Sequence, residues 1–422
     1  MKPGYKHSEA GVIPEDWEVS QLGKKVTFKT GPFGSALHQS DYVYGGVPVI
    51  NPMQIVDGTI VPTPSMAVTE PAARKLSDFR LSAGNVIIGR RGEMGRCAFV
   101  MTEQDGWLCG TGCMIIHTGP SLDGRYIQRV LSSPTVVAAI ENGSVGSTMN
   151  NLNQDTLGKL LVPLPPNKDE QEIIAGALCD ADALIGALDR LIAKKRDLKQ
   201  GAMQQLLTGK TRLPGFSGEW EDVTLGRLGS FFKGKGITRE DMVEYGLPCI
   251  RYGEIYTRHK DYVREFYSFV RPEVARDSQQ LHTGDLLFTG SGETAEEIGK
   301  CVAFLGNEDA FAGGDIVIFS PVGQDSMFLG YLMNYATIAE QKSRMGQGDA
   351  VVHISARSLG SLRFKRPNLP EQKAIASILS DMDAEIAVLE QRRDKTSDLK
   401  QGMMQELLTG RTRLISGPRA DR

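Results

Sequence analysis

Apolar residues recur at steps of four and three in two long stretches of the chain, one starting near residue 167 and the other near residue 368. This spacing places them on one face of an α-helix, with Lys, Arg, Asp and Glu on the flanks, which is typical of a coiled-coil seam. The residues expected to pack along the seam are Ile174, Leu178, Ile185, Leu188 and Ile192 in the first stretch and Ile375, Leu379, Met382, Ile386 and Leu389 in the second.

Both stretches carry helix-start and helix-end signals. Each opens with an Asn that can cap a helix and a Glu that can complete a capping box, and each closes on a Gly. These residues are Asn167, Glu170 and Gly209, and then Asn368, Glu371 and Gly410. Helices of about 40 residues are roughly 60 Å long. A single apolar stripe needs a partner, so we expect the two helices to pack antiparallel on each other.

Gly201 and Gly402 interrupt the helical pattern, and glycine inside a helix costs about 1 kcal/mol relative to Ala. Two interpretations are open. Each glycine marks a break between two shorter helices, or it permits the close approach of a partner.

The rest of the chain has short apolar segments bounded by Gly, Pro, Asn or Asp, which is typical of strands. Examples are 47–50, 85–88 and 114–117, with counterparts at 247–250, 285–288 and 316–319. Fewer stretches are helical, for instance 121–131 and 326–339. The fold class predicted is α+β: two globular mixed α/β heads separated by two long antiparallel coiled-coil helices.

The counterparts arise because the chain is internally duplicated. Residues 197–213 read DLKQGAMQQLLTGKTRL and residues 398–414 read DLKQGMMQELLTGRTRL. The spacing is roughly 200 residues, far longer than a solenoid period, and indicates a duplicated domain. Two copies related by an approximate two-fold suit double-stranded DNA above other targets. The predicted divisions are 1–166 for the first head, 167–212 for its helix, 213–367 for the second head, 368–414 for its helix and 415–422 for a tail.

Composition fits a globular protein with two or more domains, because 41% of the 422 residues are hydrophobic and 23% are charged. We find no membrane-spanning run and no signal peptide, so we predict a cytoplasmic protein without a membrane partner. Six cysteines are too few for a disulfide scaffold. The net charge of −3 argues mildly against non-specific nucleic-acid binding but leaves room for a locally basic groove.

The motifs that suggest a catalytic or metal site do not meet the sequence requirements of such sites. Gly209-Lys210-Thr211 resembles the end of a phosphate-binding loop but lies at a helix end. Cys109, Cys113 and His117 are spaced like metal ligands, yet the aligned residues in the second copy are Phe311, Asp315 and Phe319. We therefore predict buried free thiols, with no metal, no cofactor and no catalytic residue. The Asn/Asp-Pro-Pro-aromatic signature of amino-methyltransferases is absent, since Pro165-Pro166 precedes Asn167.

The ordered motifs resemble the specificity subunit of type I restriction–modification systems. The motifs are Ile13-Pro14-Glu15-Asp16-Trp17, Thr30-Gly31-Pro32-Phe33-Gly34-Ser35-Ala36-Leu37, the Pro-rich junctions at 162–166 and 367–370, and the Leu-Leu-Thr-Gly helix ends. The resemblance implies two target recognition domains, each reading half of a bipartite DNA sequence. It also implies that the helices dock two modification (methyltransferase) subunits and that restriction (endonuclease) subunits join. Catalysis, including adenine methylation, would then lie on other chains.

DNA contacts require polar tips on loops, with Lys or Arg at phosphates. The candidates in the first copy are Lys29, Ser35, His38, Asn51, Arg90, Arg91, Arg96 and Asn151, and those in the second are Lys233, Lys235, Arg251, Tyr252, Thr289, Ser291 and His353. The run from Gly89 to Arg96 is equally consistent with a plain hairpin. Two other functions stay open, a coiled-coil scaffold whose heads bind protein and a stand-alone nuclease.

Overall fold

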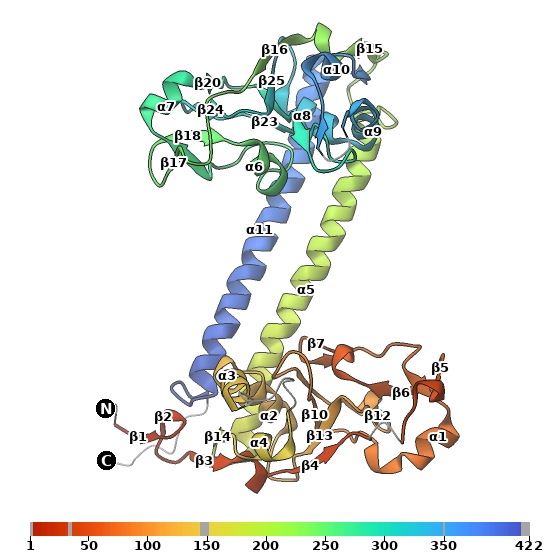
Figure 1. Cartoon of the computed structure of the whole chain (residues 1–422), viewed down its shortest axis with the longest axis vertical. Coiled ribbons are helices and arrows are strands. Elements are labelled where there is room, and N and C mark those ends of the chain that lie inside the picture. Colours follow the sequence, from red (N-terminus) through yellow and green to blue (C-terminus); the bar gives the residue numbers. More distant parts are fainter. Residues whose placement is uncertain (1–2, 33–35, 144–151, 349–350, 415–422) are drawn as a thin grey trace. The chain divides into compact units, whose positions relative to one another are not determined.

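The computed structural model describes residues 3–32, 36–143, 152–348 and 351–414. Two compact units divide the chain, Met1–Asp189 with Arg392–Arg422, and Arg190–Gln391. Each unit holds one head and a part of both long helices, so the first unit is built from both ends of the sequence (Figure 1). The division predicted from the sequence separates heads from helices instead, and it stays a prediction. Among the described helices, none is both long and apolar enough to cross a membrane.

Among its described residues, the first head contains two four-stranded sheets, a few short β-pairs and four short α-helices. One sheet has the order β11-β10-β13-β4 (Cys97–Phe99, Val86–Gly89, Cys113–His117, Thr27–Thr30), and the other β12-β6-β9-β5 (Leu108–Cys109, Val47–Ile50, Ala67–Val68, Tyr42–Val43). The remaining pairs are β1-β2 (Tyr5–Ser8, Gly11–Pro14), β3-β14 (Glu18–Gln21, Leu161–Leu164) and β7-β8 (Ile55–Val56, Thr59–Ile60). The helices are α1 (Glu70–Lys75), α2 (Gly124–Leu131), α3 (Pro134–Gly143) and α4 (Gln154–Gly158).

The second head repeats this plan. Its sheet β16-β25-β21-β23 (Gly229–Lys233, Ile316–Pro321, Leu286–Thr289, Cys301–Ala303) matches the first sheet of the first head strand for strand. A second sheet has the order β17-β19-β18-β24-β20 (Met242–Val243, Ser268–Val270, Leu247–Ile250, Phe311–Ala312, Gln279–Gln280). The part of this head that the structure describes also has the short pairs β15-β27 (Glu221–Thr224, Arg363–Arg366) and β22-β26 (Ser291–Gly292, Val352–His353). The helices are α6 (Tyr252–Thr257), α7 (Pro272–Asp277), α8 (Ser326–Asn334), α9 (Ala336–Met345) and α10 (Ala356–Gly360). The predicted α+β class is confirmed.

Strand register aligns the two copies and corrects the cysteine comparison by one residue. Cys113 pairs with Gly89, and Ile316 pairs with Thr289 at the equivalent rung. The residues that correspond to Cys109, Cys113 and His117 are therefore Ala312, Ile316 and Ser320, not Phe311, Asp315 and Phe319. Both thiols are fully buried, and burial is the main cause that raises their pKa above the ordinary value.

The two long helices are α5 (Lys168–Leu206) and α11 (Leu369–Leu407). In the first unit Lys400 pairs with Asp182 at 2.5 Å and Arg393 with Asp189 at 3.4 Å, so the α11 number falls as the α5 number rises. In the second unit Arg196 pairs with Glu390 and Lys199 with Asp383, in the same sense. The predicted antiparallel pairing is confirmed within each unit.

The helix starts confirm one half of the capping prediction and correct the other. The amide of Glu170 donates to Asn167 Oδ1 at 2.9 Å, and that of Glu371 to Asn368 Oδ1 at 3.0 Å. The glutamate side chains do not complete a capping box. Each is 1% exposed and binds an arginine that follows the end of the other long helix, as the pairs Glu170–Arg413 and Glu371–Arg212.

Of the two interpretations of Gly201 and Gly402, the break between two shorter helices is wrong, because α5 and α11 run through both positions. Helix propagation adds one backbone hydrogen bond per residue, which outweighs the local cost of a single glycine. The last helical residues are Leu206 and Leu407, and Gly209 and Gly410 follow in the left-handed region with φ of +69° and +66°.

The predicted seam divides into two kinds of position. Leu188, Ile192 and Ile386 are buried along the helices, and Ile185, Met382 and Leu389 are half-buried. The outer four residues instead belong to the head cores, Ile174 and Leu178 to the first and Ile375 and Leu379 to the second. Each head core thus includes the first turns of one long helix, which corrects their assignment to the helix–helix seam alone.

Candidate nucleic-acid interface

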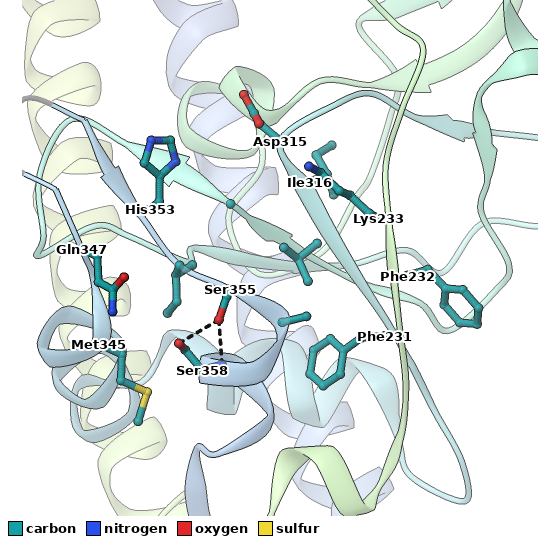
Figure 2. Close-up of a pocket in the computed structure, with 14 residues that line it drawn as sticks. Phe231, Phe232, Lys233, Asp315, Ile316, Met345, Gln347, His353, Ser355 and Ser358 are labelled. Carbon is teal, nitrogen blue, oxygen red and sulfur yellow. Dashed lines mark hydrogen bonds between the residues drawn. The ribbon is translucent and has the colours of Figure 1, made fainter.

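A depression of about 530 Å³ lies on the second head, between β16, β25 and the segment that leads into α10. Its polar lining includes Lys233, Asp315, Gln347 and His353, and Figure 2 shows these side chains around its rim. The floor is apolar, with Phe231, Ile316, Met345 and Ile354. Ser355 caps α10 by accepting from the Ser358 amide at 3.1 Å, which fixes the backbone just after His353.

A second depression, of about 680 Å³, shares Asp315 with the first. Its charged and aromatic lining consists of Arg239, Arg251, Glu254, Arg258, Tyr252 and Tyr267. Tyr252 is 43% exposed, while Arg251 donates to Glu254 at 3.3 Å and is held in place by it. The geometry thus brings four predicted residues, Lys233, Arg251, Tyr252 and His353, onto one continuous face. Lys235 is exposed two residues beyond Lys233.

Several polar side chains on this face have no hydrogen-bond or ion-pair partner among the described residues. Within the part of the chain that the structure describes, the side chains of Lys233, Arg239 and Asp315 make no hydrogen bond and no ion pair. Such groups are available to a ligand without the loss of an internal partner, so we take them as the chemical centre of this face.

Thr289 and Ser291 must be withdrawn from the DNA-contact prediction. Thr289 is 0% exposed and its hydroxyl lies 2.8 Å from that of Tyr256. Ser291 is 5% exposed and pairs with His353 across β22 and β26. A buried hydroxyl is not available to a base edge, and that of Thr289 already has a protein partner, so we assign both residues to the support of the face rather than to ligand contact.

In the first head, the three arginines of the β10–β11 turn differ in how firmly their side chains are held. Arg90 is half-buried and donates through Nε to Leu152 O at 3.0 Å, which orients its guanidinium. Burial, and then the neighbouring Arg91 cation, lowers the pKa of Arg90. Arg91 is exposed, whereas Arg96 is held by Glu93 at 2.5 Å and by Pro52 O at 3.3 Å.

The other first-head candidates are more constrained. Lys29 lies 5.1 Å from the Phe79 ring centroid and 3.7 Å from Asp78. His38 is exposed, and Asn51 accepts from the Gly112 amide at 3.3 Å. The predicted Ser35 and Asn151 lie outside the described residues.

Asp315 and Arg239 escaped the sequence-based prediction. Only the folded structure marks Asp315, because its φ is +60° and among the described non-glycine residues only Asp57 shares a positive φ. The corresponding residue of the first head is Gly112. Gly290 donates to Asp315 O at 2.6 Å as Arg90 donates to Gly112 O at 2.8 Å.

With the geometry established, comparison with known proteins decides the family. A model described as the type I restriction modification DNA specificity domain matches residues 14–194 and again residues 217–396. The chain belongs to this family. The two matches coincide with the internal duplication.

Two relatives named as type I specificity subunits align over nearly the whole chain. The type I restriction enzyme MjaVIII specificity subunit of Methanocaldococcus jannaschii is 23% identical over 430 residues, covering 95% of this chain and 94% of the relative. A second chain of that organism, named for the type I restriction enzyme MjaX, is 25% identical over 437 residues, with 97% of both covered. The S subunit structure from M. genitalium has a TM-score of 0.61 at 17% identity, covering 96% of this chain and 99% of that one, which shows a shared fold.

Membership settles the broad function. The chain is a DNA specificity subunit of the type I restriction–modification kind, which is non-catalytic. The alternative of a coiled-coil scaffold without DNA specificity is not favoured.

Proposed function

We propose that each head recognises one half of a bipartite duplex target in the major groove, and that the long helices dock two modification subunits that restriction subunits then join. The observation that carries the DNA half of this proposal is the convergence of Lys233, Arg251, Tyr252 and His353 around two adjoining depressions. We assign the assembly to the cytoplasm. The division into heads 1–166 and 213–367 and helices 167–212 and 368–414, with a tail 415–422, is part of the proposal.

The second-head face has the chemistry that DNA requires. Cations contact phosphates and fix the position of the protein, while groups that both donate and accept, such as Gln347 and His353, address base edges. The whole chain has a net charge of −3, so attraction to DNA must come from local cations such as Lys233 and Arg239. In the first head we assign this part to Lys29, Arg90 and Arg91, with His38 and Asn51 at the edge, and we keep Ser35 and Asn151 as candidates.

The docking half of the proposal rests on one repeated feature of the helices. Leu198 and Leu399 are 50% and 63% exposed, although they are large and apolar. Each lies three residues before Gly201 or Gly402, and therefore on the same helix face. A Cβ at either glycine would meet nothing within 4 Å, so nothing in the described chain fills this space. Two equivalent Leu–Gly positions, one from each copy, suit two copies of one partner.

DNA recognition is tested with the purified chain and duplex DNA over a range of salt concentrations. Contact with several phosphates makes the affinity fall steeply with salt, and each phosphate contact removed lowers the logarithmic slope by about 1. We expect the variant Lys233→Ala with Arg239→Ala to reduce the slope by about 2. A flat salt response, or no binding to duplex, would refute the proposal. Metal-dependent cleavage by the chain alone would support the nuclease alternative instead.

Docking is tested by the mass of the complex with modification subunits. We expect Leu198→Glu to leave one bound modification subunit, and Leu198→Glu with Leu399→Glu to leave none, while DNA affinity is kept. Val388→Glu is the matched control, because Val388 is also 63% exposed on α11 but its counterpart in the first copy is the small Ala187, so it has no large apolar counterpart there. Two subunits retained by the double variant would refute this docking position.

A further inference from the structure

Asp315 is the residue of the second-head face that lines both depressions. It is exposed and precedes β25, with its carbonyl fixed by the Gly290 amide at 2.6 Å. A φ of +60° is uncommon for a residue with a side chain, although Asp tolerates it better than most. Figure 2 shows the carboxylate at the rim, on the same side as His353 and Lys233. Among the described residues its carboxylate has no hydrogen-bond or ion-pair partner.

The first head has no side chain at this point and no room for one. A Cβ on Gly112 would lie 2.8 Å from Pro52 Cδ and 3.5 Å from Asn51 Oδ1. The duplicated positions of Asn51 and Pro52 carry Arg251 and Tyr252 in the second head. The second head thus has Tyr252 where the first has Pro52, and it has the Asp315 carboxylate where the first has Gly112. The two heads therefore present opposite chemistry here, the donor Arg90 in the first and the acceptor Asp315 in the second.

A free carboxylate among cations works against phosphate binding, so its placement calls for a different target. An ionised Asp only accepts hydrogen bonds. In the major groove the donors are the amino groups of cytosine and adenine, and adenine sets its N7 acceptor beside its amino group. That N7 repels the second carboxylate oxygen, whereas cytosine offers its N4 amino group without such a neighbour on the base.

We infer that Asp315 is a specificity-determining residue of the second head, and that its carboxylate accepts a hydrogen bond from the N4 amino group of a cytosine in one half-site. This inference rests on the proposed recognition of duplex DNA and assigns one base of the target to one residue.

The experiment selects bound duplexes from a random DNA library with the full chain and sequences them. The wild type is expected to recover a two-part motif with a cytosine at the Asp315 position. Asp315→Asn should shift that position toward adenine, because an amide pairs with the N6 and N7 atoms of adenine. Asp315→Gly, which restores the residue of the first head and suits the positive φ, should lose preference there. A discrimination of roughly 5- to 150-fold between bases is expected to disappear, and the other half-site should not change.

Asp57→Asn is the matched control, because Asp57 is an exposed Asp with φ of +48° that belongs to the first head and lines neither depression of the second. It should return the wild-type motif. Thermal melting of each variant separates misfolding from a change in recognition. An unchanged motif in both Asp315 variants overturns the inference and leaves DNA recognition standing, and so does a uniform change of affinity for all sequences. Loss of all binding by variants that melt like the wild type also overturns it. If the wild type selects no motif, both proposals fall.

Discussion

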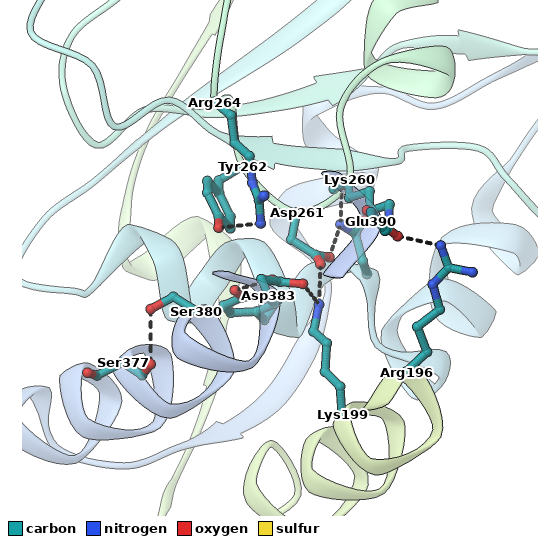
Figure 3. Close-up of polar contacts among 12 residues, drawn as sticks. Arg196, Lys199, Lys260, Asp261, Tyr262, Arg264, Ser377, Ser380, Asp383 and Glu390 are labelled. Atoms are coloured by element: carbon teal, nitrogen blue, oxygen red, sulfur yellow. Dashed lines mark hydrogen bonds and ion pairs between the residues drawn. The ribbon is translucent and has the colours of Figure 1, made fainter. Parts of the chain in front are cut away.

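Removal of the Lys199 amine should destabilise the second unit far more than removal of its counterpart destabilises the first. Lys199 Nζ lies 2.8 Å from Asp383 Oδ1 and 3.2 Å from Asp261 Oδ2, and Figure 3 shows it between the two carboxylates. The three side chains are only 10–12% exposed. Tyr331 donates to Asp383 at 2.6 Å, and burial is the first cause that raises the pKa of this phenol.

The magnitude follows from what remains after the substitution. Lys199→Ala leaves two buried carboxylates with only the neutral donors Tyr331 and Asn334. Removal of one partner from a buried ion pair typically costs 3–5 kcal/mol, and the slight exposure here places the loss at about 3 kcal/mol.

The duplication provides the control. Lys400 occupies the equivalent position in the first unit and pairs with Asp182 at 2.5 Å, where the side chains are 25% and 34% exposed. Asp182 also keeps Arg129 at 2.6 Å, so Lys400→Ala leaves no unpaired buried charge. We expect about 0.5 kcal/mol, the usual value for an exposed pair.

Hydrogen exchange followed by mass spectrometry measures each unit separately. Peptides from α8 report on the second unit and peptides from α2 on the first. Lys199→Ala should raise exchange of α8 amides by about 100-fold, since ~1.4 kcal/mol corresponds to a factor of ten.

Two results would refute this reasoning. One is an equal effect of Lys199→Ala and Lys400→Ala on their own units. The other concerns the double variant Lys199→Ala with Asp383→Asn, which removes one unpaired charge and should recover part of the loss. No recovery would show that the charge is not the cause.

Three further predictions concern other features of the chain. Gly201→Ala should raise the free energy of unfolding by about 0.5–1 kcal/mol, because a Cβ meets nothing within 4 Å there, and a urea melt that shows destabilisation would contradict it. Only Cys179 is partly exposed among the six cysteines, so a thiol reagent should label one cysteine rapidly in the native protein and six after unfolding. Burial raises the pKa of Cys97 to about 12, against about 8.5 when unfolded, so its stabilising contribution is complete below pH 8.5 and is lost as pH rises further; Cys97→Ala should flatten the alkaline loss of stability in urea melts.

Much of the helical half of this molecule follows from sequence because its determinants are local. Apolar spacing, an Asn cap and a final Gly all act within a few residues, and they predicted α5, α11 and their antiparallel pairing. The partner of Glu170 was not predictable in this way. Arg413 lies far along the chain, and only the folded unit brings the two together. The same holds for Gly201, whose local cost is offset by the helix on either side of it.

The residue types of the candidate site were predictable from the sequence, but the exposure of each side chain was not. Lys233, Arg251, Tyr252 and His353 were identified as polar tips of the second copy, and they do meet on one face. Thr289 and Ser291 looked equivalent to them, but long-range pairing with Tyr256 and β26 buries both. Asp315 was misaligned by one residue with Cys113, because strand register depends on hydrogen bonds between distant segments.

The two Arg–Glu pairs at the helix ends, Arg212–Glu371 and Arg413–Glu170, also set the order in which the two units fold during synthesis. The second unit, Arg190–Gln391, is continuous in sequence and can close Arg212 onto Glu371 once its last residues leave the ribosome. The first unit must wait, because Glu170 stays without its cation, and the core around Ile174 without Leu407, until the residues up to Arg413 have been synthesised. The second unit therefore completes its folding before the first, although the first begins earlier in the sequence. A nascent chain that stops before residue 392 would carry a finished second head and an open first one, exposed to proteases and chaperones.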